Sequence, residues 1–357
     1  MKSILITGGC GFIGSHTCLC LLKENYNLVV LDSNINSSEE SLKRVIRIAK
    51  EEGQNYKNQV SFFKGDIRDK SLLCNIFSEA IRKKAPIEAV IHFAGLKSIE
   101  KSIKEPLLYW ENNVVGSIVL FKEMEKFGCT KIVFSSSASI YSGKELKEGE
   151  KTLNLSEDSD ISPNNPYGQT KLAIEEILKN IHNSAKTKWG IINLRYFNPI
   201  GAHPSGLIGE NPPQVPDNLF PYICNVASKK FKRLKIYGND WPTNDGTCVR
   251  DFIHIMDLAE AHVSALNYLF ENKPKIINLN IGTGVGTSVL ELVNTFIKVN
   301  KCDVPYTFNQ RRSGDLSTLV ADNELANKTL NWIPKRSLRN MCEDGWKRQK
   351  NFIKENL

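Results

Sequence analysis

Short apolar runs alternate with longer amphipathic segments over the first two hundred residues of the chain. Apolar runs bounded by turn residues are typical of buried strands, and they occur at residues 3–7, 28–31, 60–64, 89–92, 131–135 and 190–195. Apolar positions three and four residues apart predict helices over residues 15–23, 42–52, 71–83, 107–127 and 166–185. Because strands and helices alternate, the pattern predicts an α/β fold built on a doubly wound, mostly parallel sheet.

The pattern changes after residue 198. Residues 199–217 are rich in glycine and proline, and helical patterns follow over residues 219–227, 257–270, 289–299 and 338–352. An apolar run at 276–281 predicts one more strand, which we expect to rejoin the first sheet. We therefore predict two domains: residues 1–198, joined by the strand near 276–282, and a smaller mixed α/β lobe over residues 199–357.

The loop after the first predicted strand carries glycines at positions 8, 11 and 14. This spacing lets the backbone turn sharply and approach a pyrophosphate, which the amino end of the following helix also favours. The second predicted strand ends in Asp32, where dinucleotide-binding sheets place the acid that holds a ribose 2′-hydroxyl. Since an acid there repels a 2′-phosphate, the sequence predicts a Rossmann-type sheet that binds NAD rather than NADP.

Other polar residues follow predicted strands, at the sheet edge where ligands of parallel sheets bind. Asp66 and Ile67 follow the third strand and suit the edge of an adenine, although a simple turn with a solvated acid fits them equally well. The fourth strand precedes a segment of small residues, 93–97, that ends in Lys97, a candidate contact of the nicotinamide or a phosphate. Serines 135–137 end the fifth strand, and their hydroxyls are suited to hydrogen-bond a reacting group.

A polar stretch over residues 143–165 predicts a surface excursion before the helix that begins at Pro166. On that helix, Tyr167 and Lys171 are four residues apart and share one face. A free tyrosine has a pKa of about 10, and an ammonium one turn away favours the phenolate and lowers that pKa. An exposed Tyr–Lys pair is the alternative interpretation; after a glycine loop and a serine-bearing strand, the spacing predicts a catalytic pair.

Composition limits the remaining function classes. The formal net charge of +8 fits anionic small molecules, and the basic cluster at 229–233 has neither the aromatics nor the motif of a nucleic-acid site. No apolar run approaches the length of a membrane span. Nine cysteines without a paired spacing predict free thiols, no metal site and a cytoplasmic location.

Arg250 and Arg312 suit a diphosphate and Asp315 suits ribose hydroxyls, although a surface salt bridge is the simpler interpretation of either arginine alone.

Eight motifs, in order over nearly the whole chain, resemble the extended short-chain dehydrogenase/reductase family and within it the nucleotide-sugar epimerases. They read GGCGFIGSH, FAGLK, NNV, FSSSASIY, PYGQTK, LRYFNPIGAHPSG, GTCVRDFIH and RRSGDL. Departures from the family pattern include Ser33, Ser139, Ser142 and the pair Gln169-Thr170, none of which replaces a reacting group. The resemblance implies a Rossmann-type domain that binds NAD and a smaller lobe that binds a UDP-sugar.

The implied activity is NAD-dependent epimerisation at carbon 4 of a UDP-hexose, which interconverts UDP-glucose and UDP-galactose through a 4-keto intermediate. The resemblance implies that Tyr167 removes the proton of the sugar 4-hydroxyl, that Ser137 assists, and that Lys171 holds the nicotinamide ribose. Cofactor contacts carry over to Gly8, Gly11, Phe12, Ile13, Gly14, Asp32, Asn36, Asp66, Ile67, Phe93, Ala94, Lys97, Asn112, Tyr167 and Lys171. Substrate contacts carry over to Ser137, Asn198, Asn218, Leu219, Tyr237, Arg250, Arg312, Asp315 and Leu319.

Several alternatives stay open at this point. Leu319 stands where a large aromatic residue in the family is associated with exclusion of N-acetylated sugars, so turnover of UDP-N-acetylhexosamines remains an option. A UDP-glucuronate 4-epimerase fits the same motifs. A 4,6-dehydratase or decarboxylase of the same fold is a further alternative, and Ala138 and Ser139 count against the dehydratase, which needs an acid beside the serine. A module that only senses NAD or a UDP-sugar is the non-enzyme alternative. The resemblance also implies a homodimer formed through the helices at 107–127 and 167–181.

Overall fold

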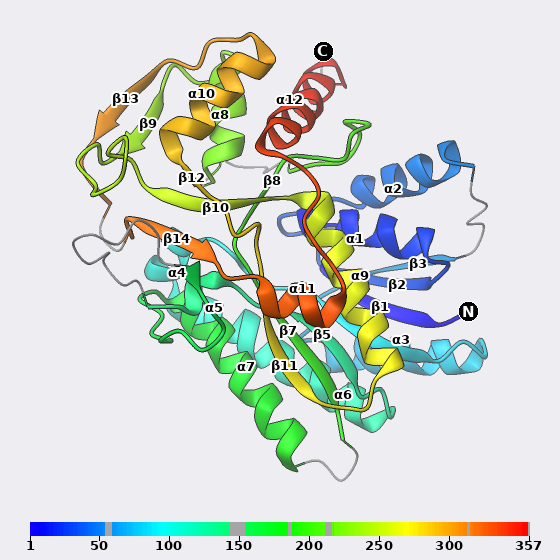
Figure 1. Cartoon of the computed structure of the whole chain (residues 1–357). Coiled ribbons are helices and arrows are strands. Elements are labelled where there is room, and N and C mark those ends of the chain that lie inside the picture. Colours follow the sequence, from blue (N-terminus) through cyan, green and yellow to red (C-terminus); the bar gives the residue numbers. More distant parts are fainter. Residues whose placement is uncertain are drawn as a thin grey trace. The chain divides into compact units, whose positions relative to one another are not determined.

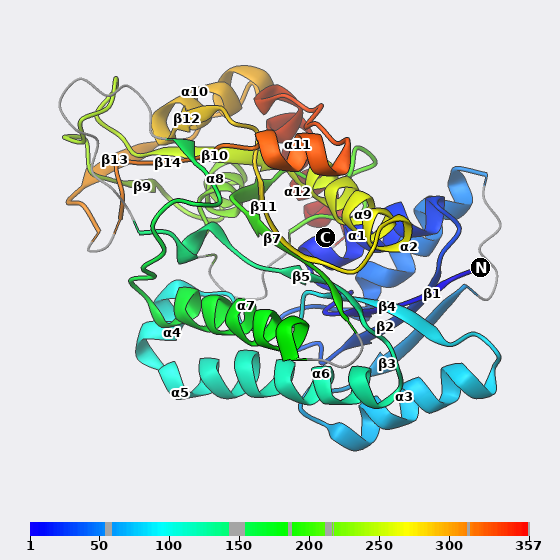
Figure 2. The ribbon, with the colours of Figure 1, turned by 60° about the horizontal axis from the view of Figure 1, so that its bottom comes forward.

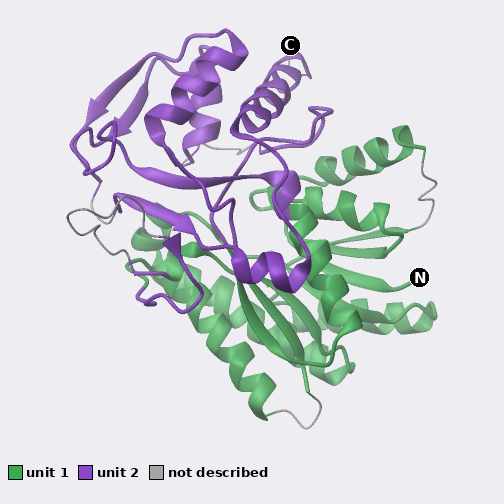
Figure 3. Cartoon of the chain, viewed as in Figure 1, with its two compact units in different colours: residues 1–140, 163–195, 259–279 green, residues 141–162, 196–258, 280–357 purple. Residues whose placement is uncertain are grey.

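The computed structural model describes residues 1–53, 59–142, 154–184, 188–210, 216, 218–312 and 315–355 (Figure 1). Parts of three predicted features lie outside the described residues: the excursion at 143–165, the Gly/Pro-rich segment at 199–217 and the RRSGDL motif. Residue 185, the predicted end of the helix that begins at Pro166, also lies outside them. The chain divides into two compact units, shown in Figure 3. Unit 1 comprises residues 1–140, 163–195 and 259–279, and unit 2 comprises residues 141–162, 196–258 and 280–357. The assignment of NAD to the first predicted domain and of a UDP-sugar to the second stays a prediction.

The described residues of unit 1 are built on a seven-stranded sheet with the order β11-β7-β5-β4-β1-β2-β3. Adjacent strands from β7 to β3 are parallel. The strands are β1 (Ser3–Thr7), β2 (Asn27–Asp32), β3 (Val60–Lys64), β4 (Ile87–His92), β5 (Lys131–Ser135), β7 (Gly190–Tyr196) and β11 (Ile276–Ile281). The predicted doubly wound parallel sheet is therefore confirmed, including the late strand β11 at its edge.

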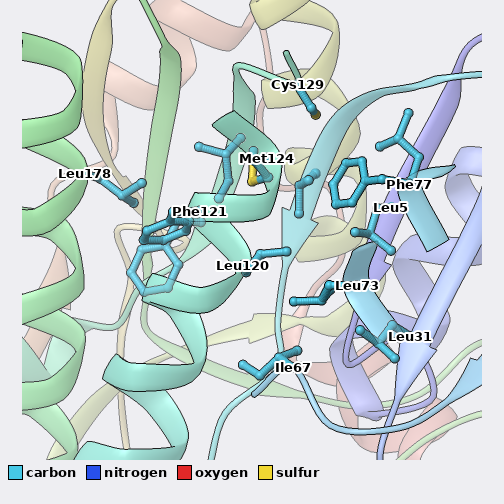
Figure 4. Packing of buried hydrophobic residues seen from close by; sticks show 14 of the residues in the cluster. Leu5, Leu31, Ile67, Leu73, Phe77, Leu120, Phe121, Met124, Cys129 and Leu178 are labelled. Carbon is cyan, nitrogen blue, oxygen red and sulfur yellow. The ribbon is translucent and has the colours of Figure 1, made fainter. Parts of the chain in front are cut away.

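Helices cover both faces of this sheet, as Figure 2 shows, with α3, α6 and α7 on one face and α1, α2 and α9 on the other. Their bounds are α1 (Phe12–Lys23), α2 (Glu39–Glu51), α3 (Lys70–Arg82), α6 (Gly116–Lys126), α7 (Pro166–Ser184) and α9 (Ile255–Glu271). Asp69 begins α3 by accepting a hydrogen bond from the Leu72 backbone N–H. Leucine, isoleucine and phenylalanine side chains of α3, α6 and α7 fill the core against the sheet (Figure 4). This packing fixes the carboxyl ends of the strands, where the predicted site residues lie.

The helix predicted over residues 107–127 contains an irregular turn. It begins as α5 (Pro106–Tyr109), passes through one π-helical segment (Trp110–Val115) and continues as α6. The short helix α4 (Ile99–Lys104) precedes it. Such π-helical turns occur frequently at functional sites, and this one carries Asn112 and Asn113.

Unit 2 has a mixed sheet that the sequence pattern did not predict. Its order is β12-β10-β14-β6, with β8 beside β10; β12 is antiparallel to β10, and the other pairs are parallel. Two further strands, β9 and β13, pair with each other. The bounds are β6 (Asn154–Leu155), β8 (Asn198–Ile200), β9 (Leu234–Tyr237), β10 (Val249–His254), β12 (Gly286–Ser288), β13 (Tyr306–Asn309) and β14 (Thr318–Ala321). Most of these strands have two to four residues, which is too short to show an alternation in the sequence.

The helices of unit 2 are α8 (Leu219–Ala227), α10 (Val289–Asn300), α11 (Glu324–Leu330) and α12 (Leu338–Glu355). Ser288 and Glu291 form a capping box at the amino end of α10. Apolar side chains of α8, α10 and α12 form a separate core with those of β9 and β10. Among the described residues, no helix combines the length and apolar character needed to cross a membrane.

Candidate active site

The glycine loop of unit 1 is closed too tightly for side chains. Gly8 has a φ of +74°, and a Cβ there would lie 2.8 Å from the Ala94 backbone nitrogen. A Cβ on Gly14 would lie 2.3 Å from the Gly8 carbonyl oxygen, which the start of α1 approaches. The residue that precedes α1 is Gly11, which has no side chain to cap the helix, and Phe12 and Ile13 follow it. The loop therefore has the backbone path that a pyrophosphate requires, with helix amides directed at it.

Asp32 lies beside this loop at the end of β2 and is 6% exposed. Its Oδ2 accepts a hydrogen bond from the Cys10 backbone N–H at 2.9 Å, and its Oδ1 accepts from the Asn34 N–H and the Ser37 hydroxyl. An ionised carboxylate accepts about four hydrogen bonds, so these three leave capacity for a ribose hydroxyl. The loop, the open helix end and this acid together fit the adenosine half of NAD.

The other predicted cofactor residues of unit 1 lie in differing surroundings. Asp66 forms an ion pair with Arg68 at 2.8 Å, and hydrogen bonds from Arg68 hold the pKa of Asp66 below its usual value. The Phe93 backbone N–H donates to the Thr7 carbonyl, which places Phe93 and Ala94 beside the glycine loop. Further predicted contacts are buried (Ile67), half-buried (Asn112) or exposed (Asn36 and Lys97).

Ser137, Tyr167 and Lys171 form one buried cluster at the carboxyl end of β5. The Lys171 Nζ donates to the Ser135 carbonyl at 2.7 Å and lies 5.8 Å from the centre of the Tyr167 ring. Tyr167 is hydrogen-bonded with Ser137. Gly168 permits this approach, because a Cβ there would lie 2.5 Å from the Ser139 carbonyl oxygen. The structure thus brings together the three residues that the sequence predicted as catalytic.

Protonation in this cluster differs from the simple expectation. Burial raises the pKa of Tyr167 above its usual value, and the hydrogen bond with Ser137 acts in the opposite direction. Burial lowers the pKa of Lys171 to about 8, while the Glu175 carboxylate opposes that change. The pKa of Tyr167 is therefore not lowered as predicted from its proximity to Lys171, because burial of the tyrosine raises it.

Two buried polar side chains that sequence reasoning missed connect the parts of this site. His92 contacts the Thr7 hydroxyl at 2.6 Å and the Ser117 hydroxyl at 2.9 Å. Burial, with the charge of Lys171, lowers the pKa of His92 to about 3, so the ring is neutral. Asn113, on the π-helical turn, accepts from the Leu96 N–H and donates to the Thr170 hydroxyl. The NNV motif contained the signal for Asn113, but only Asn112 was assigned from it.

Predicted substrate residues of unit 2 form two groups. Arg250 pairs in register with Leu319, donates to the Val249 and Leu316 carbonyls at 2.9 Å, and lies 3.9 Å from the Asp315 carboxylate. In the second group, the Arg312 guanidinium lies 3.9 Å from the centre of the Tyr237 ring. The other three lie elsewhere in the unit: Asn198 on β8, Leu219 at the start of α8, and Asn218, which donates to Glu210.

Comparisons with known proteins agree with this geometry. A family model described as GDP-mannose 4,6 dehydratase matches residues 5–345. The chain is 47% identical over 351 residues to the UDP-glucose 4-epimerase of Bacillus subtilis (strain 168), with 98% of each chain covered. It is 48% identical over 345 residues to UDP-glucose 4-epimerase 2 of Arabidopsis thaliana, covering 97% of this chain and 94% of that one.

Solved structures of the same kind share the fold. A UDP-glucose 4-epimerase from Stenotrophomonas maltophila, with bound NAD and formylated UDP-arabinopyranose, matches with a TM-score of 0.91 and 39% identity, covering 99% of this chain and all of that one. One from Bifidobacterium longum, in complex with NAD⁺ and UDP, matches with a TM-score of 0.88 and 39% identity over 98% of both chains. The resemblance inferred from the eight motifs is confirmed: the chain belongs to the UDP-glucose 4-epimerase family, a branch of the extended short-chain dehydrogenases/reductases.

Proposed function

We propose that the chain is an NAD-dependent epimerase that interconverts UDP-glucose and UDP-galactose by inverting carbon 4 of the hexose. The observation that carries this proposal is the buried cluster of Ser137, Tyr167 and Lys171 in the unit that holds the glycine loop and Asp32. A base, a hydrogen-bonding hydroxyl and an ammonium in one dry site suit removal of a proton from an alcohol.

NAD, when bound, supplies the hydride acceptor and donor that inversion at carbon 4 requires. Tyr167 takes the proton of the 4-hydroxyl and returns it to the same oxygen once carbon 4 has been inverted. Ser137 hydrogen-bonds the same oxygen, and the Lys171 ammonium stabilises the phenolate of Tyr167. The reaction uses no external oxidant, because the electrons that leave the hexose return to it.

Arginines of unit 2 support a nucleoside diphosphate as the other half of the substrate. Arg250 is held in place by two backbone carbonyls, which leaves its guanidinium oriented before a ligand binds. A planar guanidinium is suited to a diphosphate, and Asp315 beside it suits the ribose hydroxyls. We assign these residues, with Asn198, Asn218, Leu219, Tyr237 and Arg312, to the UDP moiety.

The decisive experiment is conversion of UDP-galactose to UDP-glucose by the purified protein, followed by chromatography of the products. Tyr167→Phe should lower kcat by about 10³-fold, since a positioned base contributes on the order of 10² to 10⁴. Bound NAD, measured from the absorbance of released cofactor, should be unchanged in the variant. Turnover equal to that of the original protein would remove Tyr167 as the base, and a protein inert with added NAD would refute the proposed reaction.

Leu319 supports a wider substrate range as a second proposal. Leu319 is half-buried on β14 and pairs with Arg250, so its side chain borders the residues assigned to the substrate. A leucine leaves more space than an aromatic side chain does, which suits an N-acetyl group. We expect measurable epimerisation of UDP-N-acetylglucosamine, reduced at least about 10-fold in Leu319→Tyr while UDP-glucose turnover is retained. Failure of the original protein to use the N-acetylated sugar would restrict the range to unsubstituted hexoses.

We also infer a homodimer formed through the helices of unit 1. Ile103, Leu107 and Val115, between α4 and the start of α6, are 63%, 82% and 47% exposed. Ile99, Leu108 and Trp110 are also exposed over the same elements, so apolar side chains cluster on this surface. A second copy that covers it with its own α4 to α7 region would bury these side chains. Sedimentation as a dimer, shifted to monomer by Leu107→Glu, is the expected result, and a monomer at micromolar concentration contradicts it.

A cytoplasmic location is the last part of the proposal. All nine cysteines carry free thiols, and seven of them are buried. Burial raises the pKa of Cys10 and Cys129 to about 12, which keeps these thiols unreactive. Free cysteines in this number suit a reducing compartment. Cell fractionation with a tagged protein tests the location directly.

A further inference from the structure

A buried ion pair lies directly behind the serine turn of the candidate site. Glu175 on α7 and Arg195 on β7 have side chains that are 4% and 2% exposed. The Arg195 Nη2 lies 2.7 Å from Glu175 Oε2, and the Arg195 Nε donates to Oε1 at 3.1 Å. The Ser136 hydroxyl donates to the same Oε1 at 2.5 Å. One carboxylate thus joins helix α7, strand β7 and the end of β5, all of which belong to unit 1.

Stability alone is a weak reason for such a pair. Removal of two charges from water carries a large desolvation penalty, and replacement of buried pairs by apolar residues of similar volume is often neutral or stabilising. The location of this pair suggests a different role. Glu175 follows Lys171 by four residues on α7, so the two side chains lie one helical turn apart on the same face.

Lys171 is surrounded by few groups that stabilise its charge. Its Nζ donates to the Ser135 carbonyl at 2.7 Å and lies 5.0 Å from the centre of the Phe134 ring, both on β5. Among the described residues, the titratable groups that act on it are Tyr167 and Glu175 on its own helix and His92 on β4, and Arg195 on β7 is the partner of Glu175. His92 is neutral and Arg195 is a cation, so Glu175 is the anion of this group of four.

We propose that Glu175, held by Arg195 and Ser136, is a positioning residue that keeps the Lys171 side chain beside Tyr167 in its ammonium form. This inference rests on the proposed function, because the charge of Lys171 matters for the phenolate of Tyr167. Burial lowers the pKa of Lys171 to about 8, and the Glu175 carboxylate opposes that decrease. Without the carboxylate, Lys171 would lose its proton at lower pH, and the tyrosine would lose its stabilising cation.

The test is the double variant Glu175→Gln/Arg195→Met, which removes the carboxylate without leaving a buried arginine unpaired. Removal of Arg195 by itself favours the Lys171 ammonium. Any decrease in the pKa of Lys171 in the double variant is therefore due to the loss of Glu175. The high-pH limb of the kcat profile should move to lower pH, by less than the roughly 1 to 3 units that loss of a nearby opposite charge alone produces, because loss of Arg195 acts the other way. The KM for UDP-galactose should change less than kcat at pH 9.

A second readout does not depend on turnover. Ultraviolet difference absorbance between the holoenzyme and its Tyr167→Phe variant reports formation of the Tyr167 phenolate as the pH is raised. In the double variant this titration should move to higher pH, because the ammonium that favours the phenolate is lost earlier. If the original protein proved inert towards UDP-galactose, the proposed function would fail while this titration still tested the role of Glu175.

Matched variants separate this role from a structural one. Asp257→Asn/Arg336→Met removes a comparable ion pair of unit 2, in which Asp257 is fully buried, and should leave both titrations unmoved. Glu175→Asp keeps the charge and should restore most of the original pH profile. Ser136→Ala keeps the ion pair and removes one donor from the carboxylate, so its high-pH limb should stay or move slightly higher.

The two titrations distinguish a charge effect of Glu175 from structural support. The proposal is supported if the high-pH limb of the kcat profile moves to lower pH and the Tyr167 phenolate forms at higher pH. A decrease in kcat that is equal at every pH, with both titrations unmoved, assigns the pair to structural support and overturns it. If the double variant does not fold, Ser136→Ala decides, since a limb that moves to lower pH in that variant contradicts the proposed charge effect.

Discussion

The two units hold their candidate site residues in opposite ways. In unit 1, Ser137, Tyr167 and Lys171 are at least nine-tenths buried and hydrogen-bonded within the fold. In unit 2, the Arg250 side chain is 17% exposed and Arg312 is exposed, and both guanidiniums are supported by carbonyl oxygens or an aromatic ring. Water therefore solvates these two guanidiniums better than it solvates the Lys171 ammonium of unit 1.

This contrast separates proton transfer from ligand binding. Burial changes the proton affinity of a side chain, which a residue that exchanges a proton requires, but it raises the free energy of the folded state. An arginine that stays hydrated keeps its charge at no such cost and gives up water only when an anion arrives. We therefore expect changes in unit 1 to act on kcat and changes in unit 2 to act on KM.

The largest effect is expected from Lys171→Met. Loss of the ammonium removes the cation beside the Tyr167 phenolate, so kcat for UDP-galactose should fall by about 10³-fold, within the range of about 10² to 10⁴ for acid–base groups. Steady-state kinetics at saturating NAD measures this, with KM expected to change only a few-fold. Lys179→Met, on an exposed lysine of the same helix, is the control and should leave kcat unchanged. A larger change in KM than in kcat would contradict the contrast between the units.

The converse prediction concerns Arg250→Ala in unit 2. Hydrogen bonds to charged groups contribute about 1.5 to 3 kcal/mol, so the KM for UDP-galactose should rise roughly 10- to 100-fold. We expect kcat to stay within about threefold, because Arg250 holds the diphosphate rather than the reacting carbon. Arg233→Ala, at an exposed arginine outside both groups, provides the control. A decrease in kcat with an unchanged KM would place Arg250 in the chemical step instead.

The third prediction concerns a buried acid of unit 2 whose hydrogen-bond partners, among the described residues, are neutral N–H and hydroxyl groups. Asp251, adjacent to Arg250, accepts hydrogen bonds from the Thr283 N–H and hydroxyl, the Gly284 N–H and the Ala321 N–H. In Asp251→Asn, the amide NH₂ would face N–H donors, so the free energy of unfolding should fall by about 2 to 3 kcal/mol. Urea denaturation at pH 7 measures this change. Asp240→Asn at an exposed acid should have little effect, and equal values for the two variants would refute the anchoring role.

The same contrast explains what the sequence could predict about the fold. Strands of unit 1 are apolar runs of five to seven residues, so β1, β3 and β5 have the predicted bounds. Strands of unit 2, such as β8 and β12 with three residues each, are too short for a periodic pattern, and polar residues interrupt β10. Their pairing depends on contacts between segments distant in sequence, which a local pattern does not record.

Prediction of the site had a similar limit. Tyr167 and Lys171 share a helix, so their four-residue spacing was enough to predict their common face. The partner of Glu175 is Arg195, which lies on a strand twenty residues later, and the pairing depends on how α7 packs on the sheet. The effect of burial on the Tyr167 pKa was also missed, because the sequence showed the neighbouring charge but not the exclusion of water.

The smallest expected effect is a gain in stability in Lys171→Met, the variant for which the largest decrease in kcat is expected. The pKa of Lys171 is lowered to about 8 in the folded protein, against about 10.4 in the unfolded chain. Between these values the unfolded chain binds one more proton, so stability rises with pH across that window, and the full destabilisation is present below pH 8.

Lys171→Met removes this destabilisation, at the loss of the hydrogen bond to the Ser135 carbonyl. The free energy of unfolding at pH 7 should therefore increase by about 1 kcal/mol, and the difference from the original protein should shrink as the pH rises towards 10. Urea denaturation at pH 7, 8 and 9.5, without added NAD, measures this trend. Arg250→Ala should show no such gain, since its guanidinium is partly hydrated in the folded state. The measured quantity is the free energy of unfolding of Lys171→Met minus that of the original protein. If this difference is smaller at pH 7 than at pH 9.5, burial of this ammonium does not oppose folding.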